Sequence, residues 1–265
     1  MKSLVRWSAT LGLVGSSLLG SFFIGNLQAL ALPEDQVVQK LQSVPVFTIT
    51  DPQGSPLVAS VPNGQNKAVA VAPAFISQRD AQAFVDKLRT DKPELKTVQV
   101  VPVSMGEVYK LGKDSQSKPD ALNFQYVPVQ QQVQLAQAIV SQTGQQAQPF
   151  QGTPLFVATS DSPQNFLVFP VANGQQAIPF FFDKDQLQGV VDKIKQQQPN
   201  TKVQITVVPL ESVINKLQTS NDPFVEKIQL VRSQEAEQFV QSLPASRPGN
   251  QPQAPQQRAP QAPRR

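Results

Sequence analysis

Side chains able to do acid, base or nucleophilic chemistry are sparse in this sequence. Its 265 residues include no histidine and no cysteine, which removes the commonest catalytic base, thiol nucleophiles, and the soft or imidazole ligands of metals. Hydrolysis could still use paired carboxylates, a serine with a lysine, or a hard metal ion held by carboxylates. Only spacings that bring such groups together would indicate an enzyme.

A few residues come near to such spacings. Asp183 and Asp185 are two positions apart, but Asp183 precedes a helical apolar pattern and is better explained as a helix N-cap, as is Ser77. Ser212 and Lys216 have the spacing of ordinary neighbours on a solvent-facing helix. The sequence shows no G-x-S-x-G motif, Gly-rich phosphate loop or calcium loop. It therefore predicts no enzymatic activity, no catalytic residue, no metal site and no cofactor.

The unusual residues are apolar. Three consecutive phenylalanines lie in a strand pattern, and alternation sends Phe180 and Phe182 to one face and Phe181 to the other. Phe181 matches Phe75 and is expected in the core. For Phe180 and Phe182, a core position competes with a partly open groove, which could bind extended or amphipathic segments of other proteins. The candidate binding residues for such segments are Phe166, Phe169, Phe180 and Phe182.

The elements that must position these residues occur twice. A capped helix, a Pro-marked turn and a buried strand are predicted over Ser77 to Val103, and the same pattern returns over Asp183 to Leu210. The apolar helix positions recur 106 residues later, and strand residue Phe75 recurs as Phe181. Such a repeat predicts a duplicated chain. The expected fold class is α+β, with two pseudo-symmetric halves, each a small mixed sheet with packed helices.

Individual elements follow from periodicity and turn signals. In the first half, we expect helices over 33–41, from 77, over 104–111 and 131–141, and strands over 44–50, 57–61, 68–72, 98–103 and 124–129. In the second half, we expect strands over 155–158, 166–169, 178–182 and 203–210, and helices from 183 and over 211–217. Residues 113–120 are expected to form a loop, and 224–240 a strand followed by a helix.

Composition shifts divide the chain. Residues 1–31 combine a basic start, an apolar run and the sequence Ala29-Leu30-Ala31, which indicates a secretory signal peptide, with an uncleaved membrane anchor as the alternative. The first repeat is expected over 32–143, a Gln-rich joint over 144–152 and the second repeat over 153–243. Residues 244–265 are dominated by Pro, Gln, Ala and Arg, so we expect a disordered tail.

The charge of the predicted folded region excludes one class of partner. Six of the 23 basic residues lie in 1–31 and 244–265, so the region 32–243 holds 17 basic against 19 acidic residues. This nearly neutral composition argues against nucleic-acid binding. The four arginines of the tail allow a weak contact with a membrane surface, although a solvated tail without a role is the simpler interpretation.

Several stretches together resemble a known family. They are the opening LPEDQVVQKLQSVPVFTITD, the PNGQ turn, the helix SQRDAQAFVDKLR, and the stretch VQVVPVSMGEVYKL with its echo VVPLESVINKL. In these the chain is similar, over about Pro33 to Val240, to the twenty-two-kilodalton subunit family of the chloroplast inner-envelope translocon, in its cyanobacterial branch. The resemblance rests on the duplicated layout and not on a catalytic motif.

The resemblance implies a non-enzymatic, chaperone-like factor with hydrophobic pockets on its outer faces. The implied partners are unfolded precursor proteins, above all outer-membrane β-barrel precursors, together with an Omp85-type assembly factor. The implied location is the periplasm, with the thylakoid lumen as the alternative. A second interpretation is a static adaptor or scaffold of an envelope translocation complex, in which the apolar surface would be a permanent interface.

Overall fold

The computed structural model describes residues 32–62, 68–116, 121–142, 149–162, 164–171 and 174–243. The predicted signal peptide 1–31, the predicted tail 244–265 and residues 144–148 of the predicted joint lie outside the described residues. None of the described helices is both long and apolar enough to cross a membrane.

The first half builds one sheet. Its elements in chain order are α1 (Glu34–Gln42), β1 (Pro45–Thr50), β2 (Ala59–Pro62), β3 (Ala68–Phe75), α2 (Gln78–Asp91), a 3-10 turn (Pro93–Leu95), β4 (Gln99–Ser104), α3 (Met105–Ser115), β5 (Leu122–Val127) and α4 (Gln130–Gln142). Strand β3 pairs antiparallel with β1 and β2 and parallel with β5, while β4 pairs antiparallel with β1. The sheet is therefore mixed, as predicted.

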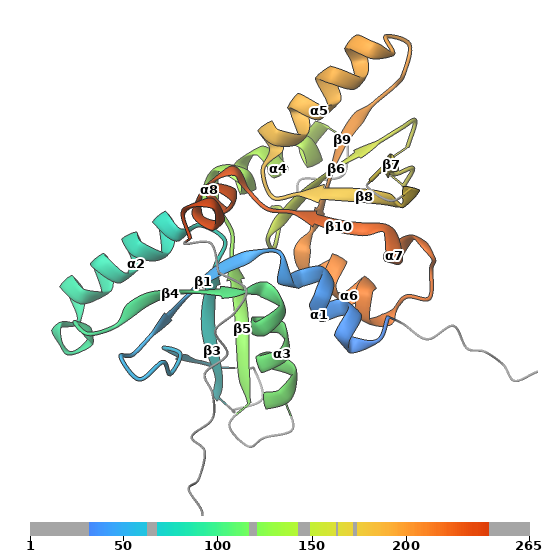
Figure 1. Ribbon diagram of the computed structural model, residues 1–265. Coiled ribbons are helices and arrows are strands. Elements are labelled where there is room, and N and C mark those ends of the chain that lie inside the picture. The colour runs from blue at the N-terminus through green and yellow to red at the C-terminus, as the bar shows by residue number, and fades with distance from the viewer. Residues whose placement is uncertain are drawn as a thin grey trace, which may run out of the picture.

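The second half repeats this plan (Figure 1). It contains β6 (Pro154–Thr159), β7 (Phe169–Pro170), β8 (Gln176–Phe181), α5 (Lys184–Gln197), β9 (Gln204–Pro209), α6 (Leu210–Thr219), α7 (Phe224–Lys227), β10 (Ile228–Val231) and α8 (Gln234–Ser242). Strand β8 pairs antiparallel with β6 and β7 and parallel with β10, and β9 pairs antiparallel with β6. Helices α2 and α5 have 14 residues each and begin 106 positions apart. The predicted duplication and fold class are confirmed.

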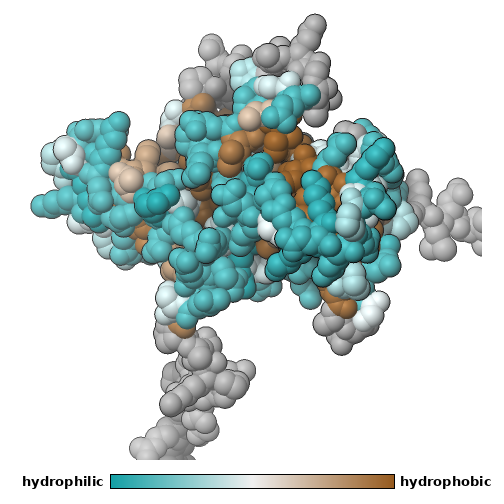
Figure 2. All heavy atoms as spheres, turned by 90° about the horizontal axis from the view of Figure 1, so that it is seen from above, coloured by the Kyte–Doolittle hydropathy of each residue, from teal (hydrophilic) through white to brown (hydrophobic). Residues whose placement is uncertain are grey.

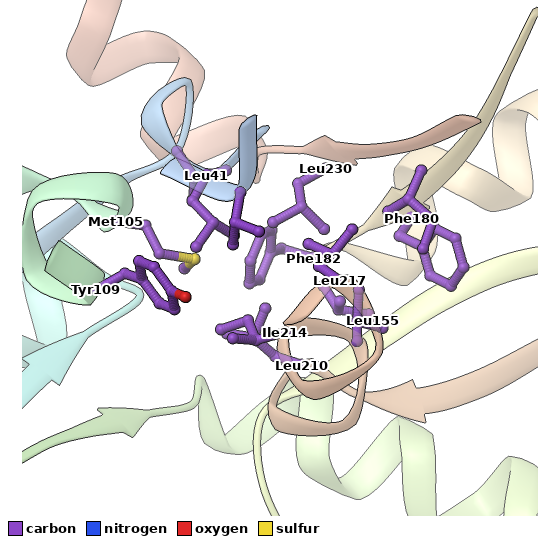
Figure 3. Close-up of a cluster of buried hydrophobic side chains, with 14 of the residues drawn as sticks. Leu41, Met105, Tyr109, Leu155, Phe180, Phe182, Leu210, Ile214, Leu217 and Leu230 are labelled. Atoms are coloured by element: carbon purple, nitrogen blue, oxygen red, sulfur yellow. The ribbon is translucent and has the colours of Figure 1, made fainter. Parts of the chain in front are cut away.

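The halves share a central core. Helices α1, α3 and α6 lie between the inner faces of the two sheets, and their apolar side chains meet those of both sheets (Figures 1 and 3). The cluster joins Leu41 and Met105 of the first half to Phe182 and Ile214 of the second. Burial of apolar area holds such elements together. The two repeats therefore form one continuous core.

The last helix of each half packs against the opposite half. Ala136 of α4 lies in the outer-face core of the second sheet, with Phe156 and Phe181. Phe239 of α8 packs on the outer-face core of the first sheet, where its ring meets that of Phe47 edge-on at a centroid distance of 5.1 Å. The predicted boundaries of the repeats stay a prediction, and helix packing crosses between them in both directions.

Hydrogen bonds fix this exchange at two helix N-termini. The side chain of Gln132 in α4 accepts from the backbone N–H of Lys184 at 3.1 Å, at the start of α5. In the mirrored position, the carboxylate of Glu235 in α8 accepts from the backbone N–H of Arg79 at 3.0 Å and from the Ser77 hydroxyl at 3.2 Å. These bonds satisfy N–H groups that a helix leaves unpaired in its first turn. Each exchanged helix thus caps a helix of the other half.

Three expectations differ from the structure. Residues 113–115 continue α3 instead of forming a loop, because Ser115 Oγ donates to Gly112 O and accepts from Leu122 N, which ties the helix end to β5. Residues 224–227 form the short helix α7 instead of a strand, because Asp222 accepts from the N–H of Phe224. The predicted strand 166–169 is reduced to a bridge at Phe166 and the two-residue strand β7.

Lys40 closes the outer edge of β10. Its ammonium group donates to the carbonyl oxygens of Glu226 at 2.7 Å and Ile228 at 3.1 Å. Burial lowers the pKa of Lys40, and the Glu226 charge opposes that shift. The two carbonyls thus offset the desolvation of a cation that lies at an interface between halves.

We expect Lys40→Met to destabilise the protein by about 1–2 kcal/mol, because two carbonyls lose a charged donor. Urea unfolding of the variant measures this loss. Lys87→Met, on the exposed face of α2, is the control and should change stability by less than about 0.5 kcal/mol. Equal effects of the two changes would show that the Lys40 contacts are not stabilising.

Candidate functional site

Two of the residues considered for catalysis, Ser77 and Asp183, act as helix caps. The side chain of Ser77 accepts from the N–H of Asp80, and that of Asp183 from the N–H of Asp185, so both expected N-caps are confirmed. Ser104 forms a complete capping box with Glu107. Within the described part of the chain, no cluster of acidic residues could hold a metal ion.

The four candidate phenylalanines divide into two pairs. Phe180 and Phe182 have exposed fractions of 2% and 3% and point into the central core, while Phe181 lies in the outer-face core, so the predicted alternation is confirmed. Of the two positions considered for Phe180 and Phe182, the open groove is wrong, because both side chains lie in the central core, where the ring of Phe166 also packs against Phe180 (Figure 3). Their role in binding other proteins stays a prediction.

Phe166 and Phe169 are half-buried. The ring of Phe166 packs against Phe180 at 5.6 Å and against Phe224 at 6.0 Å, so it covers the edge of the central core. Phe169 lies on β7 opposite Ala177. The four residues therefore do not form one surface, and Phe169 is next in the chain to the exposed Val168.

Exposed apolar side chains recur at equivalent places in the two halves. Val58 precedes β2 and Val61 lies in it, and their exposed fractions are 47% and 45%. Val168 and Val171 flank β7, with exposed fractions of 43% and 38%. The second pair lies 110 positions after the first, each before an Asn-Gly dipeptide. We call these four residues the paired valines.

Other apolar side chains are exposed as well. Phe84 of α2 is 43% exposed and its ring packs against Phe75 at 5.4 Å. Figure 2 shows apolar residues gathered in a central band on the face seen from above, with hydrophilic residues around it. Contiguous apolar surface rimmed by polar residues marks sites where proteins bind one another. The arrangement therefore favours binding of a polypeptide over chemistry.

A cavity of about 810 Å³ lies where the two halves meet beside β5. On one side it is lined by strand residues that include Asn123, Phe124 and Gln125, and on the other by Gly152, Pro209, Glu211 and Ser212. These residues come from β5, from the segment before β6 and from the junction of β9 with α6. The cavity is therefore built by both halves.

Glu211 is the charged residue at this cavity. Its carboxylate oxygens accept from the backbone N–H of Thr153 at 3.2 and 3.1 Å. Burial raises the pKa of the neighbouring Tyr126, and the charges of Glu211 and Tyr109 add to that shift. Tyr126 is therefore a neutral hydroxyl at physiological pH, and Glu211 gives the cavity negative charge.

Sequence reasoning identified neither the paired valines nor the cavity beside β5. The repeat of L-V-x-x-V before Asn-Gly was visible in the sequence and could have indicated the paired valines. The cavity had no such signal, because it depends on how β5 and α6 of different halves approach each other.

Comparison with known proteins agrees with this architecture. A model of the Tic22-like family matches residues 17–242. The structure of a Tic22 protein from Anabaena, described as a protein of protein transport, superposes with a TM-score of 0.72 at 30% sequence identity, covering 82% of this chain and 100% of the other. Tic22 from Plasmodium falciparum superposes with a TM-score of 0.60 at 20% identity, covering 77% of this chain and 95% of the other, and supports the fold alone.

No curated protein sequence matched the chain. The family model nevertheless spans both repeats and the exchanged helices, and the Anabaena structure is covered over its whole length. The chain thus belongs to the Tic22-like family.

Proposed function

We propose that the protein is an exported, non-enzymatic carrier that binds unfolded segments of precursor proteins in the periplasm and aids their transport and outer-membrane biogenesis. The observation that carries the proposal is the recurrence of the paired valines, exposed on both halves of a duplicated fold. Equivalent apolar surfaces on two halves suit a flexible chain that contacts both. The description of the Anabaena relative as a protein of protein transport supports this choice.

Weak binding at each surface fits such a role. Burial of an apolar side chain of a client contributes roughly 1.5–3 kcal/mol, from which the ordering of the client is subtracted. Two such contacts on one client act together through effective concentration and still release quickly. The rival function, a static adaptor in an envelope complex, would use the same surfaces for one folded partner.

The test replaces the paired valines by threonine, which keeps the branched shape and strand propensity but adds a hydroxyl. We expect the fourfold variant V58T/V61T/V168T/V171T to bind an unfolded outer-membrane β-barrel precursor about tenfold more weakly, because the loss of about 1.4 kcal/mol is tenfold in affinity. Fluorescence anisotropy without nucleotide measures the binding. Each double variant should show an intermediate loss.

The control is Ser60→Thr, at an exposed position of β2 between Val58 and Val61, which should bind like the unmodified protein. An unrelated unfolded chain separates the two functions, since a chaperone binds it as well. Unchanged precursor binding by the fourfold variant would overturn the proposal, and binding to a folded partner alone would favour the adaptor.

A further inference from the structure

The edge strands of the two sheets differ in whether their outward backbone groups are blocked. Apart from the short strands β2 and β7, which pair only with β3 and β8, the outermost strands are β4 and β5 in the first sheet and β9 and β10 in the second. A free strand edge offers a row of N–H and C=O groups to any extended chain, and natural proteins block such edges with proline, lysine or a covering element. Three of the four edges carry a device of this kind.

Proline lies on two of these edges, within β4 and at the last residue of β9. In β4, Met105 N–H donates to Val44 O, so the alternation of the antiparallel ladder turns Pro102 outward. In β9, Leu210 N–H donates to Thr153 O, which turns Pro209 outward in the same way. Proline has no N–H, so each edge lacks a donor where a neighbouring strand would need one.

The third edge, that of β10, is closed by α1. Phe182 N–H donates to Val231 O, so Ile228 and Leu230 turn their backbone groups outward. The Ile228 carbonyl is then taken by Lys40 of α1. Helix α1 reaches this place by packing against α3 at Gly106, where an added Cβ would lie 2.7 Å from Val38 O.

The edge of β5 is blocked only at its first residue, Leu122, whose C=O accepts from Ser115 Oγ and whose N–H donates to it. Ile76 N–H donates to Val127 O, so Phe124 and Tyr126 turn their N–H and C=O groups away from β3. Among the described residues, no strand pairs with this edge, and the strand itself contains no proline or lysine. The edge opens instead on the cavity of about 810 Å³. This cavity lies at the place that α1 fills in the other half.

The shape of the cavity favours a strand over a second helix. Glu211 stands second in α6, as Gly106 stands second in α3. A helix could not approach α6 as α1 approaches α3, because the Glu211 side chain occupies that position and bonds Thr153. An extended chain needs only about 4.8 Å beside β5. The Glu211 carboxylate would complement a basic side chain on it.

We infer that the β5 edge binds an extended, positively charged segment of another polypeptide by strand addition, with backbone bonds to Phe124 and Tyr126 and a Lys or Arg near Glu211. This site goes beyond the paired valines, because it recognises backbone and charge. The chain's own residues 244–265 contain arginines but also six prolines, which lack the N–H groups that strand addition uses.

The test uses disulfide cross-linking, since the natural sequence has no cysteine. Gln125→Cys places a thiol on the exposed face of β5, and Gln99→Cys is the matched control on β4, whose edge Pro102 interrupts. The probe is a short blocked peptide of alternating valine and threonine with one lysine and one cysteine, the cysteine being moved along the peptide. We expect cross-linking to Gln125→Cys at alternate positions only, about tenfold above Gln99→Cys.

Two further arms complete the test. Methylating the peptide nitrogens that would face β5 should abolish cross-linking, whereas methylating the alternate nitrogens should not. Glu211→Gln should weaken binding of the lysine peptide about fivefold and leave a glutamine-substituted peptide unchanged. A cross-linking period of three to four positions would indicate a helix and overturn the inference. So would equal cross-linking at both cysteines, or displacement of the probe by a peptide of residues 244–265.

The cross-linking result tests the β5 inference separately from the proposed function of the paired valines. The paired-valine variants should cross-link the probe like the unmodified protein. If they lose precursor binding while cross-linking persists, both sites exist. If cross-linking fails while precursor binding depends on the valines, only the β5 inference is lost.

Discussion

The variant Phe180→Asp should not fold. Phe180 is 2% exposed and lies in the core shared by the two halves. Truncation of a buried phenylalanine costs about 3–5 kcal/mol, and a carboxylate without a partner adds several more. The sum approaches the whole stability of an ordinary domain, about 5–15 kcal/mol. Circular dichroism and urea unfolding should show loss of the cooperative transition.

The same change tests the rejected groove. An open groove at Phe180 and Phe182 predicts a thermal midpoint that hardly moves while binding is lost, whereas burial predicts collapse of the midpoint. Phe180→Leu is the conservative control and should cost about 1–2 kcal/mol with folding retained. A folded Phe180→Asp protein with an unchanged midpoint would contradict the buried position.

The variant Phe239→Ala should destabilise the protein by about 2–3 kcal/mol, although Phe239 lies far along the chain from its partners. The ring is half-buried and meets Phe47 edge-on in the outer-face core of the first half. It therefore contributes both buried area and an aromatic contact. Urea unfolding gives the size of the loss.

Hydrogen exchange locates the effect. The loss of protection should begin in β1 and α2 of the first half, and not in the second half from which α8 comes. A double-mutant cycle with Phe47→Ala should show coupling of about 0.5–3 kcal/mol. Gln238→Ala, an exposed neighbour on α8, is the control. Protection lost mainly in the second half would contradict the exchange of helices.

Sequence reasoning succeeded where local patterns decide the structure. The repeat at 106 residues, the caps at Ser77 and Asp183, and the alternation of Phe180 and Phe181 follow from spacing and are all confirmed. Burial of Phe180 could not be predicted, because the covering residues come from helices of both halves. A strand with apolar side chains on both faces looks the same in sequence whether a helix or solvent covers one of them.

The exchange of α4 and α8 was beyond prediction for a similar reason. Both helices have an apolar stripe, and the pattern states only that the stripe is buried. Which sheet buries it depends on the direction in which the chain leaves β5 and β10. The hydrogen bonds between Gln132 and Lys184 and between Glu235 and Arg79 fix that direction, but they exist only in the folded protein.

The exchanged helices also set an order of events for a chain that emerges from its N-terminus onward. The first sheet is complete once β5 has appeared, yet its outer-face core still lacks Phe239, near the end of the folded region. Local contacts form early and distant ones must wait for the rest of the chain. The N-terminal half therefore remains unfinished until almost the whole polypeptide has been made.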